Sequence, residues 1–204
     1  MIGIINYGSG NIQAIANIYH RLNISFKIME KPSQLHEASK LILPGVGAFD
    51  ETMQRLDSSG MREALEKKVM EEKIPIIGVC VGMQIMAKKS EEGVLDGLGW
   101  IDGNVKKIKT ATLQQKPHLP HLGWDTIQPL RESPLFDHID LDKGFYFLHS
   151  FCFFCSKAED VLASTDYGEE FASAVNVQNI YGVQFHPEKS HKNGIELLKN
   201  FASL

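Results

Sequence analysis

The feature of the sequence that most constrains the fold is the stretch from Ile74 to Gln84. A continuous apolar run ends in Gly-Val-Cys-Val-Gly at residues 78–82, and a pattern with helical spacing follows it as far as Lys88. This order is typical of a nucleophile elbow, in which a buried strand turns sharply into a helix. The residue at the apex, Cys80, is then held in an unfavourable backbone conformation with its side chain in a cleft. The glycines fit because a Cβ at their positions would meet the crowded turn.

Cys80 is the candidate nucleophile of the chain. The N-terminus of the helix that follows adds partial positive charge beside the sulfur, which favours the thiolate over the thiol. The alternative is a structural cysteine, because free cysteines are among the most buried residues. The two flanking glycines and the change from strand to helix favour the catalytic interpretation.

A nucleophile needs a base and a group that orients the base, and residues 182–190 (Gly-Val-Gln-Phe-His-Pro-Glu-Lys-Ser) provide both. In an extended segment, the Cα atoms of residues two apart lie about 6.5 Å from each other on the same side. The Glu188 carboxylate can therefore accept the imidazole N–H of His186 and fix its tautomer, while Pro187 fixes the backbone between them. A lone His-Pro-Glu is usually an exposed turn. After an alternating strand, and in a chain with an elbow, it predicts a catalytic pair.

The composition excludes several classes of protein. The chain has 204 residues, enough for a single α/β domain over residues 1–204 with a sizeable core. Its formal net charge is −4 and charged residues make up 23%, so nothing indicates a nucleic-acid surface. No apolar stretch reaches the length of a membrane span, and residues 1–5 lack the basic leader of a signal peptide. Three cysteines without such a signal predict reduced thiols and a cytoplasmic location.

Periodicity places the remaining elements. Aromatic, β-rich segments at 144–154, 171–176 and 180–185 look like an antiparallel extension that delivers His186 to the cleft, and a helix at 194–204 closes the domain. Loops are expected at 90–103 and 110–116, and Ser33 is expected to cap a brief helix. The other expected elements are strands at residues 2–5, 25–29, 40–43, 105–109 and 124–128 and helices at 11–22 and 61–73.

Two further patterns are weak. Gly8-Ser9-Gly10 mimics the start of a dinucleotide fingerprint, but a glutamine stands at the third glycine position. His118 and His121 with Cys152 and Cys155 offer four zinc ligands on paper. The phenylalanines around the two cysteines alternate as in a strand, which disfavours that site, and we expect neither a metal nor a cofactor.

A series of motifs resembles the class I (triad) glutamine amidotransferases in type and in order. The resemblance covers residues 1–201 and implies an open, mostly parallel sheet with helices on both faces and an antiparallel extension. Within the family, the chain is similar to the glutaminase subunits that serve imidazole glycerol phosphate synthesis in histidine biosynthesis. It is also similar to a branch that supplies ammonia for the amidation of surface-polysaccharide sugars. The motifs are Tyr-Gly-Ser-Gly-Asn (7–11), Leu-Pro-Gly-Val-Gly-Ala-Phe (43–49), Gly-Val-Cys-Val-Gly-Met-Gln (78–84), Pro-His-Leu-Gly-Trp (120–124), Tyr-Phe-Leu-His-Ser-Phe (146–151) and Gly-Val-Gln-Phe-His-Pro-Glu (182–188).

The resemblance implies a catalytic triad of Cys80, His186 and Glu188. Attack on an amide creates an oxyanion, and two backbone N–H groups are the usual way to hold it. One is expected from Val81, directly after the nucleophile. The other is expected from the glycine-rich segment of Gly45, Val46 and Gly47, which the resemblance implies is misoriented until a partner binds its own ligand. Residue types alone leave a tight turn without catalytic duty as the alternative for this segment.

The remaining family roles concern substrate and partner. The resemblance implies that Gln84 binds the amino-acid end of the substrate, and that the backbone of three residues holds its carboxylate: His149, Ser150 and Phe151. Three other residues are implied to face the partner: Asn11, Tyr146 and Lys189. Plainer interpretations stay open, namely a polar first-turn residue for Gln84, a solvated turn for Asn11 and a core aromatic for Tyr146.

These residues predict that Cys80 attacks the carboxamide of L-glutamine and that water then hydrolyses the glutamyl thioester to glutamate. Free ammonia is protonated in water and lost as a nucleophile, so a second protein must receive it through a sheltered path. The resemblance implies a HisF-type (β/α)₈ barrel cyclase as this partner. Two rivals are an inactive scaffold, which the intact triad disfavours, and a stand-alone cysteine hydrolase, which would be fully active without a partner.

The acceptor of the ammonia is open between the two branches. The chain departs from the usual histidine-pathway pattern at Asp125, where asparagine is typical, and at Phe151, where tyrosine is typical. The segments at 152–155 and 190–191 look similar to the sugar branch. None of these departures touches the triad.

Overall fold

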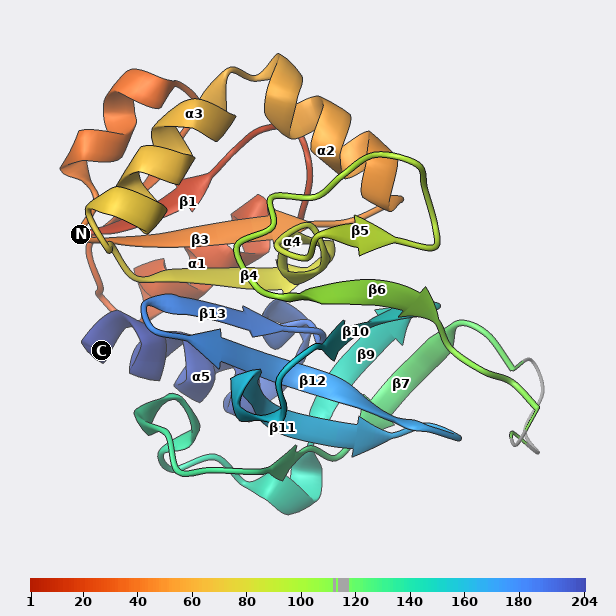
Figure 1. Ribbon diagram of the computed structural model, residues 1–204. Helices are drawn as coiled ribbons and strands as arrows, with labels where there is room; N and C mark the ends of the chain where they lie inside the picture. The colour runs from red at the N-terminus through yellow and green to blue at the C-terminus, as the bar shows by residue number, and fades with distance from the viewer. Residues whose placement is uncertain (112, 114–117) are drawn as a thin grey trace.

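The computed structural model describes residues 1–111, 113 and 118–204. One large sheet forms its centre, and half of this sheet is parallel, in the order β2-β1-β3-β4-β13 (Figure 1). The inner strands of this half carry almost only buried residues, as expected where helices cover both faces. The predicted strands at 2–5, 25–29 and 40–43 and before Cys80 are thus confirmed. The bounds are β1 (Ile2–Ile5), β2 (Phe26–Met29), β3 (Lys40–Gly45), β4 (Ile76–Cys80) and β13 (Ile180–Val183).

Beyond β13 the sheet continues with antiparallel pairing through β12, β10 and β6, which confirms the predicted extension. β11 and β8 pair beside β12, and β5 pairs in parallel with β6. A separate two-stranded sheet of β7 and β9 stands next to the extension (Figure 1). The bounds are β5 (Lys89–Ser90), β6 (Gly103–Lys107), β7 (His121–Asp125), β8 (Gln128–Pro129), β9 (Phe145–His149), β10 (Phe151–Cys155), β11 (Val161–Asp166) and β12 (Glu170–Val177).

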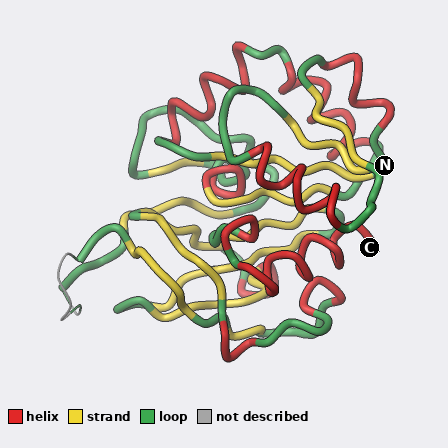
Figure 2. Tube along the Cα trace, turned by 180° about the vertical axis from the view of Figure 1, so that it is seen from behind, coloured by secondary structure: helices red, strands yellow, loops and turns green. Residues whose placement is uncertain are grey.

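Helices cover both faces of the parallel half. α1 (Ile12–Arg21) packs against α5 (His191–Ser203) on one face, whereas α2 (Phe49–Ser58) and α3 (Met61–Glu66) lie on the other (Figures 1 and 2). Each turns an apolar stripe toward the sheet, as the helical spacing of its apolar residues requires. In the described part of the chain, no helix combines the length and the apolar character needed to cross a bilayer.

Several predicted boundaries were wrong. Ser33 lies inside a 3₁₀ turn (Pro32–Glu37) instead of capping it, because the Gln34 side chain accepts the Glu30 and Lys31 N–H groups at 2.7 and 3.0 Å. The helix at 61–73 changes to a π turn after Glu66. The strand expected at 124–128 is β7, which begins earlier because its register with β9 pairs residue 121 with residue 149. Residues 112 and 114–116 of the loop expected at 110–116 lie outside the described residues.

Three glycines let the parallel strands and the turn after Cys80 touch backbone to backbone. A Cβ on Gly82 would overlap the carbonyl oxygen of Leu43 in β3, and a Cβ on Gly45 would overlap the N–H of Gly82. A Cβ on Gly78 would lie 2.7 Å from the Gly82 oxygen. The end of β3 and the elbow are therefore fixed to each other by contacts that only glycine permits.

We expect Gly82→Ala to destabilise the protein by about 3 kcal/mol or more, because both overlapping groups are backbone and neither can rotate away. The matched control is Gly99→Ala. Gly99 has a φ of +66° but no described atom within 4 Å of an added Cβ, so the strain of its backbone is the only cost, about 1 kcal/mol. Urea unfolding followed by circular dichroism measures both values. An equal loss in the free energy of unfolding for the two variants would show that the Gly82 contact does not hold the elbow.

Candidate active site

Cys80 ends β4 at a sharp turn, as predicted for an elbow. Its φ and ψ are 55° and −114°, a conformation that residues with a Cβ rarely adopt, and α4 (Val81–Gln84) begins at the next residue. The side chain is only 3% exposed. The strained backbone turns the sulfur away from the strand and toward a cavity.

The helix after the elbow is shorter than predicted, since it ends at Gln84 and does not reach Lys88. The N–H groups of Met86 and Ala87 bind the carbonyls three residues back, as in a 3₁₀ turn, and the Lys88 N–H binds the Gly103 carbonyl at the start of β6. The Lys88 N–H is therefore unavailable to extend the helix. The one-turn helix begins directly after Cys80, but it adds less dipole beside the sulfur than a long helix would.

His186 and Glu188 follow β13 and lie in contact. The Nδ1–H of His186 donates to Glu188 Oε1 at 2.8 Å, and the two side chains are only 3% and 2% exposed. The contact was predicted, but the backbone conformation predicted to produce it was wrong, because Pro187–Lys189 forms a 3₁₀ turn and not an extended segment. With Nδ1 bound to the carboxylate, the tautomer leaves Nε2 for the sulfur of Cys80, which lines the same cavity.

The electrostatics of this group favour a protonated His186. Burial by itself lowers the pKa of His186, but its hydrogen bonds to Cys80 and Glu188 outweigh burial and raise the pKa to about 10. Burial likewise acts to raise the pKa of Glu188, yet the hydrogen bonds from His186 and Asn11 hold it below its usual value. The arrangement therefore keeps a proton between the sulfur and the carboxylate, where it can be given to a leaving group.

The cavity beside Cys80 has a volume of about 430 Å³ and collects most of the predicted site residues. This volume suits a ligand of amino-acid size. Pro120 and Leu148 line it too, without having been predicted. The predicted residues that line it are Asn11, Val46, Gly47, Cys80, Val81, Gln84, His149, Ser150, Phe151, His186 and Lys189.

Three predicted residues lie outside the cavity lining. Glu188 lies behind the ring of His186. Gly45 pairs with Cys80 between β3 and β4 and touches Gly82, so its place is structural. Tyr146 packs its ring against Lys189, whose Nζ lies 5.6 Å from the ring centroid.

The predicted oxyanion segment has its central amide occupied. The Val46 N–H donates to Ser9 Oγ at 2.9 Å, and the Ser9 hydroxyl donates back to the Val46 carbonyl at the same distance. The Tyr7 hydroxyl binds the carbonyl of Pro44 at 2.5 Å and fixes the start of the segment. In this conformation the Val46 N–H cannot also hold an oxyanion, which agrees with the misoriented segment that the resemblance implied. The part of Ser9 in holding the segment was not predicted.

Asn11 contacts the catalytic machinery directly. Its Nδ2 donates to Glu188 Oε1 at 2.6 Å, so the same carboxylate oxygen receives both Asn11 and His186. The resemblance implied only a partner surface for Asn11. The two residues are 177 positions apart in the chain, and nothing in the sequence indicated their contact.

Glu92 is a cavity residue that the sequence analysis missed. Its Oε2 accepts the N–H of Phe49 at 2.9 Å and so ties its loop to the start of α2. A carboxylate at this place is suited to an ammonium group. The residue falls in a stretch without periodicity, which explains why no pattern singled it out.

A buried pair of histidines fixes the backbone that was predicted to hold the substrate carboxylate. His149 Nδ1 donates to the Phe151 carbonyl at 2.9 Å, and its Nε2 lies 3.2 Å from Nδ1 of His121. Nε2 of His121 in turn lies 3.1 Å from Asp125 Oδ2. Burial, reinforced by His121, lowers the pKa of His149 to about 3, so His149 is neutral. Its Nε2 is then an acceptor, and His121 donates to it from Nδ1.

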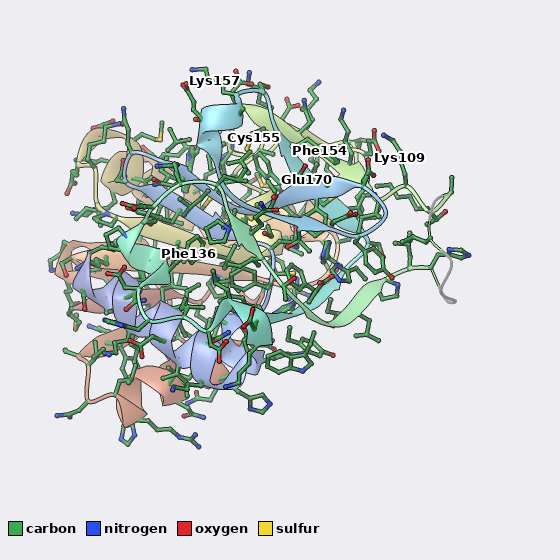
Figure 3. All side chains as sticks on the ribbon, turned by 90° about the horizontal axis from the view of Figure 1, so that it is seen from below. Lys109, Phe136, Phe154, Cys155, Lys157 and Glu170 are labelled. Atoms are coloured by element: carbon green, nitrogen blue, oxygen red, sulfur yellow. The ribbon has the colours of Figure 1, made fainter. Side chains whose placement is uncertain are left out.

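The four residues considered for zinc do not converge. His121 is engaged by His149 and Asp125, and the Cys152 thiol faces the Lys106 carbonyl at 3.8 Å. Cys155, Phe154 and Glu170 lie near one another (Figure 3) and line a separate hollow of about 250 Å³. Within residues 1–111, 113 and 118–204, no group of three or more potential ligands has the geometry of a metal site.

Comparison with known proteins identifies the family. The glutamine amidotransferase class-I family matches residues 3–203. The chain belongs to this family. The imidazole glycerol phosphate synthase subunit HisH of Bdellovibrio bacteriovorus is 51% identical to it, with all of both chains covered. The subunit HisH 2 of Pseudomonas aeruginosa is 42% identical, again over both full lengths.

Solved structures of other amidotransferases share the fold. The crystal structure of one glutamine amidotransferase superposes with a TM-score of 0.72 at 18% identity, covering 100% of this chain and 99% of that one. A glutamine amidotransferase of Thermotoga maritima superposes with a TM-score of 0.65 at 15% identity, covering 99% of this chain and 82% of that one. The α/β architecture with a mostly parallel sheet is thus that of class I glutamine amidotransferases.

His149 makes the stability of this amidotransferase depend on pH. An unfolded histidine binds a proton near pH 6.5, whereas folded His149 binds one only near pH 3. Between these values the unfolded state holds more protons, so the free energy of unfolding falls as the pH falls, by up to about 1.4 kcal/mol per unit. His149→Asn keeps a donor for the Phe151 carbonyl but cannot titrate, so we expect a shallower slope from about pH 6 to about pH 4. Urea unfolding at several pH values gives both slopes, and equal slopes would contradict a neutral His149.

Proposed function

We propose that this chain is the glutaminase subunit of an imidazole glycerol phosphate synthase. It hydrolyses L-glutamine to glutamate and ammonia and passes the ammonia to a HisF-type (β/α)₈ barrel partner, with residues 1–204 acting as one glutaminase domain. The observation that carries the proposal is the strained Cys80 beside the buried His186–Glu188 pair, in one cavity of amino-acid size. The similarity to HisH subunits over the full length supports the histidine-pathway assignment.

The reaction follows from the charges of the site. The Cys80 sulfur attacks the carboxamide carbon, and the carbonyl oxygen becomes an oxyanion near the Val81 N–H. His186 gives its proton to the amide nitrogen, the C–N bond breaks, and ammonia leaves. A glutamyl thioester is left on Cys80. His186, now neutral and oriented by Glu188, takes a proton from water as the water attacks the thioester. Glutamate leaves, and the sulfur and the imidazolium return to their starting forms.

The substrate is proposed to lie along the cavity with its amino-acid end away from Cys80. Both N–H groups of the Gln84 amide are engaged within the protein, which leaves its oxygen to accept a hydrogen bond from the substrate ammonium. The Glu92 carboxylate adds a negative charge for the same group. The backbone of residues 149–151, fixed by the histidine pair, faces the carboxylate. These side chains suffice for amide hydrolysis, so the proposal includes no metal or cofactor.

The partner is proposed to dock around the mouth of the cavity. Large apolar side chains are exposed on β7 and β9 and on the oxyanion segment: Leu122 at 59%, Trp124 at 48%, Val46 at 42% and Leu148 at 37%. Leu122 pairs with Leu148 and Trp124 pairs with Tyr146 across the two strands. These four side chains form one patch on β7 and β9. An exposed apolar patch of this kind marks an interaction surface. A partner seated there would close the cavity against water, and we place the complex in the cytoplasm.

The test of this function combines the purified glutaminase with its barrel partner and measures glutamate release and product formation. We expect little glutaminase activity from the isolated chain and strong stimulation in the complex. Cys80→Ala should abolish glutamine-dependent turnover but leave synthesis from added ammonia, because the partner's own chemistry does not use Cys80. Full activity without the partner would contradict the proposal in favour of a stand-alone hydrolase. Ammonia transfer to a nucleotide sugar would assign the chain to the polysaccharide branch instead.

Ser9 is proposed to hold the oxyanion segment in a resting orientation, because its hydroxyl occupies both polar groups of Val46. Ser9→Ala removes both hydrogen bonds and frees the Val46 N–H to turn toward the cavity. We expect the partner-free glutaminase rate to rise about tenfold, the equivalent of about 1.4 kcal/mol of released hydrogen bonding.

The matched control for Ser9 is Ser59→Ala, which removes a hydroxyl bound to the Leu56 carbonyl at the end of α2, away from the cavity. Its partner-free rate should equal that of the unchanged protein. A rate for Ser9→Ala that is unchanged or lower would show that Ser9 does not restrain the segment.

A further inference from the structure

Gln184 lies between the nucleophile and the residue proposed to bind the substrate. Its side chain is fully buried, and its Nε2 lies 3.7 Å from Cys80 Sγ. Its Oε1 accepts a hydrogen bond from Gln84 Nε2 at 3.0 Å. Gln84 Nε2 also donates to the Phe151 carbonyl at 2.9 Å. A buried series of hydrogen bonds thus connects the Phe151 carbonyl, through Gln84 and Gln184, to the sulfur of Cys80.

The direction of every bond in this series is dictated by its first member. A backbone carbonyl can only accept, so the amide of Gln84 must present its NH₂ group to Phe151. The second hydrogen of that NH₂ group then needs an acceptor, which is the oxygen of Gln184. The NH₂ group of Gln184 is therefore turned toward Cys80 Sγ, because the reversed amide would set two donors against each other.

An N–H donor at the sulfur distinguishes the two protonation states of Cys80. The thiol has its own acceptor, the Leu148 carbonyl at 3.9 Å from Sγ. The thiolate has no proton to donate, and every N–H donor that faces it stabilises its negative charge. A hydrogen bond to a charged group is about twice as strong as one to a neutral group. The amide of Gln184 thus stabilises the anionic sulfur, which is the attacking form and the form expelled when the thioester is hydrolysed.

We propose that Gln184 is a further catalytic residue, which donates a hydrogen bond to the Cys80 sulfur and is aimed at it by Gln84. This inference rests on the proposed function only in calling Cys80 the nucleophile. It involves no new covalent step. Its consequence is that a residue of the substrate site also sets the orientation of a donor to the nucleophile.

The position of the Gln184 side chain does not depend on its amide alone. The backbone N–H of Gln184 binds the Ser173 carbonyl at 2.9 Å, which holds the segment against β12. Replacing the amide by an apolar group of similar length therefore leaves the backbone in place. Gln184→Met makes that replacement, since it removes the donor and keeps the volume.

The test is the rate of alkylation of Cys80 by iodoacetamide across a pH series, without glutamine. The other cysteines interfere little, because burial raises the pKa of Cys152 and raises that of Cys155 to about 12. Mass spectrometry of the peptides assigns the modified sulfur. We expect Gln184→Met to raise the pH midpoint of Cys80 alkylation by about one unit and to lower kcat/KM about tenfold. The control is Gln128→Met on the exposed edge strand β8, which should leave the midpoint unchanged.

An unchanged midpoint in Gln184→Met would overturn the proposal even if turnover fell, because the amide would then only fill space. If that variant does not fold, Gln184→Glu keeps the shape and sets a carboxylate beside the sulfur. Its midpoint should rise further than one unit, and a midpoint equal to that of the unchanged protein would overturn the proposal.

Gln84→Met tests the aiming of Gln184 separately. Without the donor that orients it, the Gln184 amide can turn, and the midpoint should rise as well. An unchanged midpoint would overturn the role given to Gln84. Since alkylation needs neither glutamine nor partner, this result stays distinct from a failure of the proposed glutaminase function, which would appear only as absent glutamate release.

Discussion

The contact between the backbone of Gly82 and the Leu43 carbonyl is the constraint on which the site depends, because it holds the turn after β4 against the end of β3. A cysteine at positive φ costs free energy, and such strain persists only where the surrounding structure enforces it. Here the parallel pairing of β3 with β4 and the missing Cβ atoms enforce it together. The same contact places the oxyanion segment, which continues β3, beside the nucleophile.

Below the cavity, the buried side chains of Gln84, Gln184 and His149 are joined to each other, to the backbone or to Cys80 by hydrogen bonds. The Phe151 carbonyl accepts hydrogen bonds from Gln84 and from His149, so the series that ends at Cys80 and the histidine pair that ends at Asp125 meet at one atom. Buried networks of this kind are costly if any member lacks a partner and rigid if all are paired. Residues 149–151 lie where β9 ends and β10 begins. The hydrogen bonds of this network hold their backbone in place, so it can serve as a fixed surface for a substrate.

The N-terminal loop at residues 7–11 contacts both the oxyanion segment and the carboxylate behind His186. Ser9 occupies the Val46 peptide and Asn11 binds the Glu188 carboxylate, and the loop itself borders the cavity mouth. A protein docked on the apolar patch of β7 and β9 would approach this loop. Coupling between partner and glutaminase then needs only a small shift of one loop, since a change at either contact alters the oxyanion segment or the charge behind His186.

The sequence alone determined the elbow at Cys80, the contact of His186 with Glu188 and the α/β class, because each depends on neighbours in the chain: glycines around an apex, a histidine and a glutamate two positions apart, and alternating and helical periods. The 3₁₀ turn that makes the His186–Glu188 contact was not predicted, since an extended segment was expected. The sequence also placed most strands, although it misjudged the ends of β7 and of the helix after Cys80, where pairing partners far away in the sequence decide the boundary. Only the tertiary structure decided that Asn11 meets Glu188, that Ser9 occupies Val46 and that Gln184 turns its amide to the sulfur. These contacts join segments separated by long stretches of chain, and the direction of a hydrogen bond depends on the partner that folding supplies, which no local pattern contains.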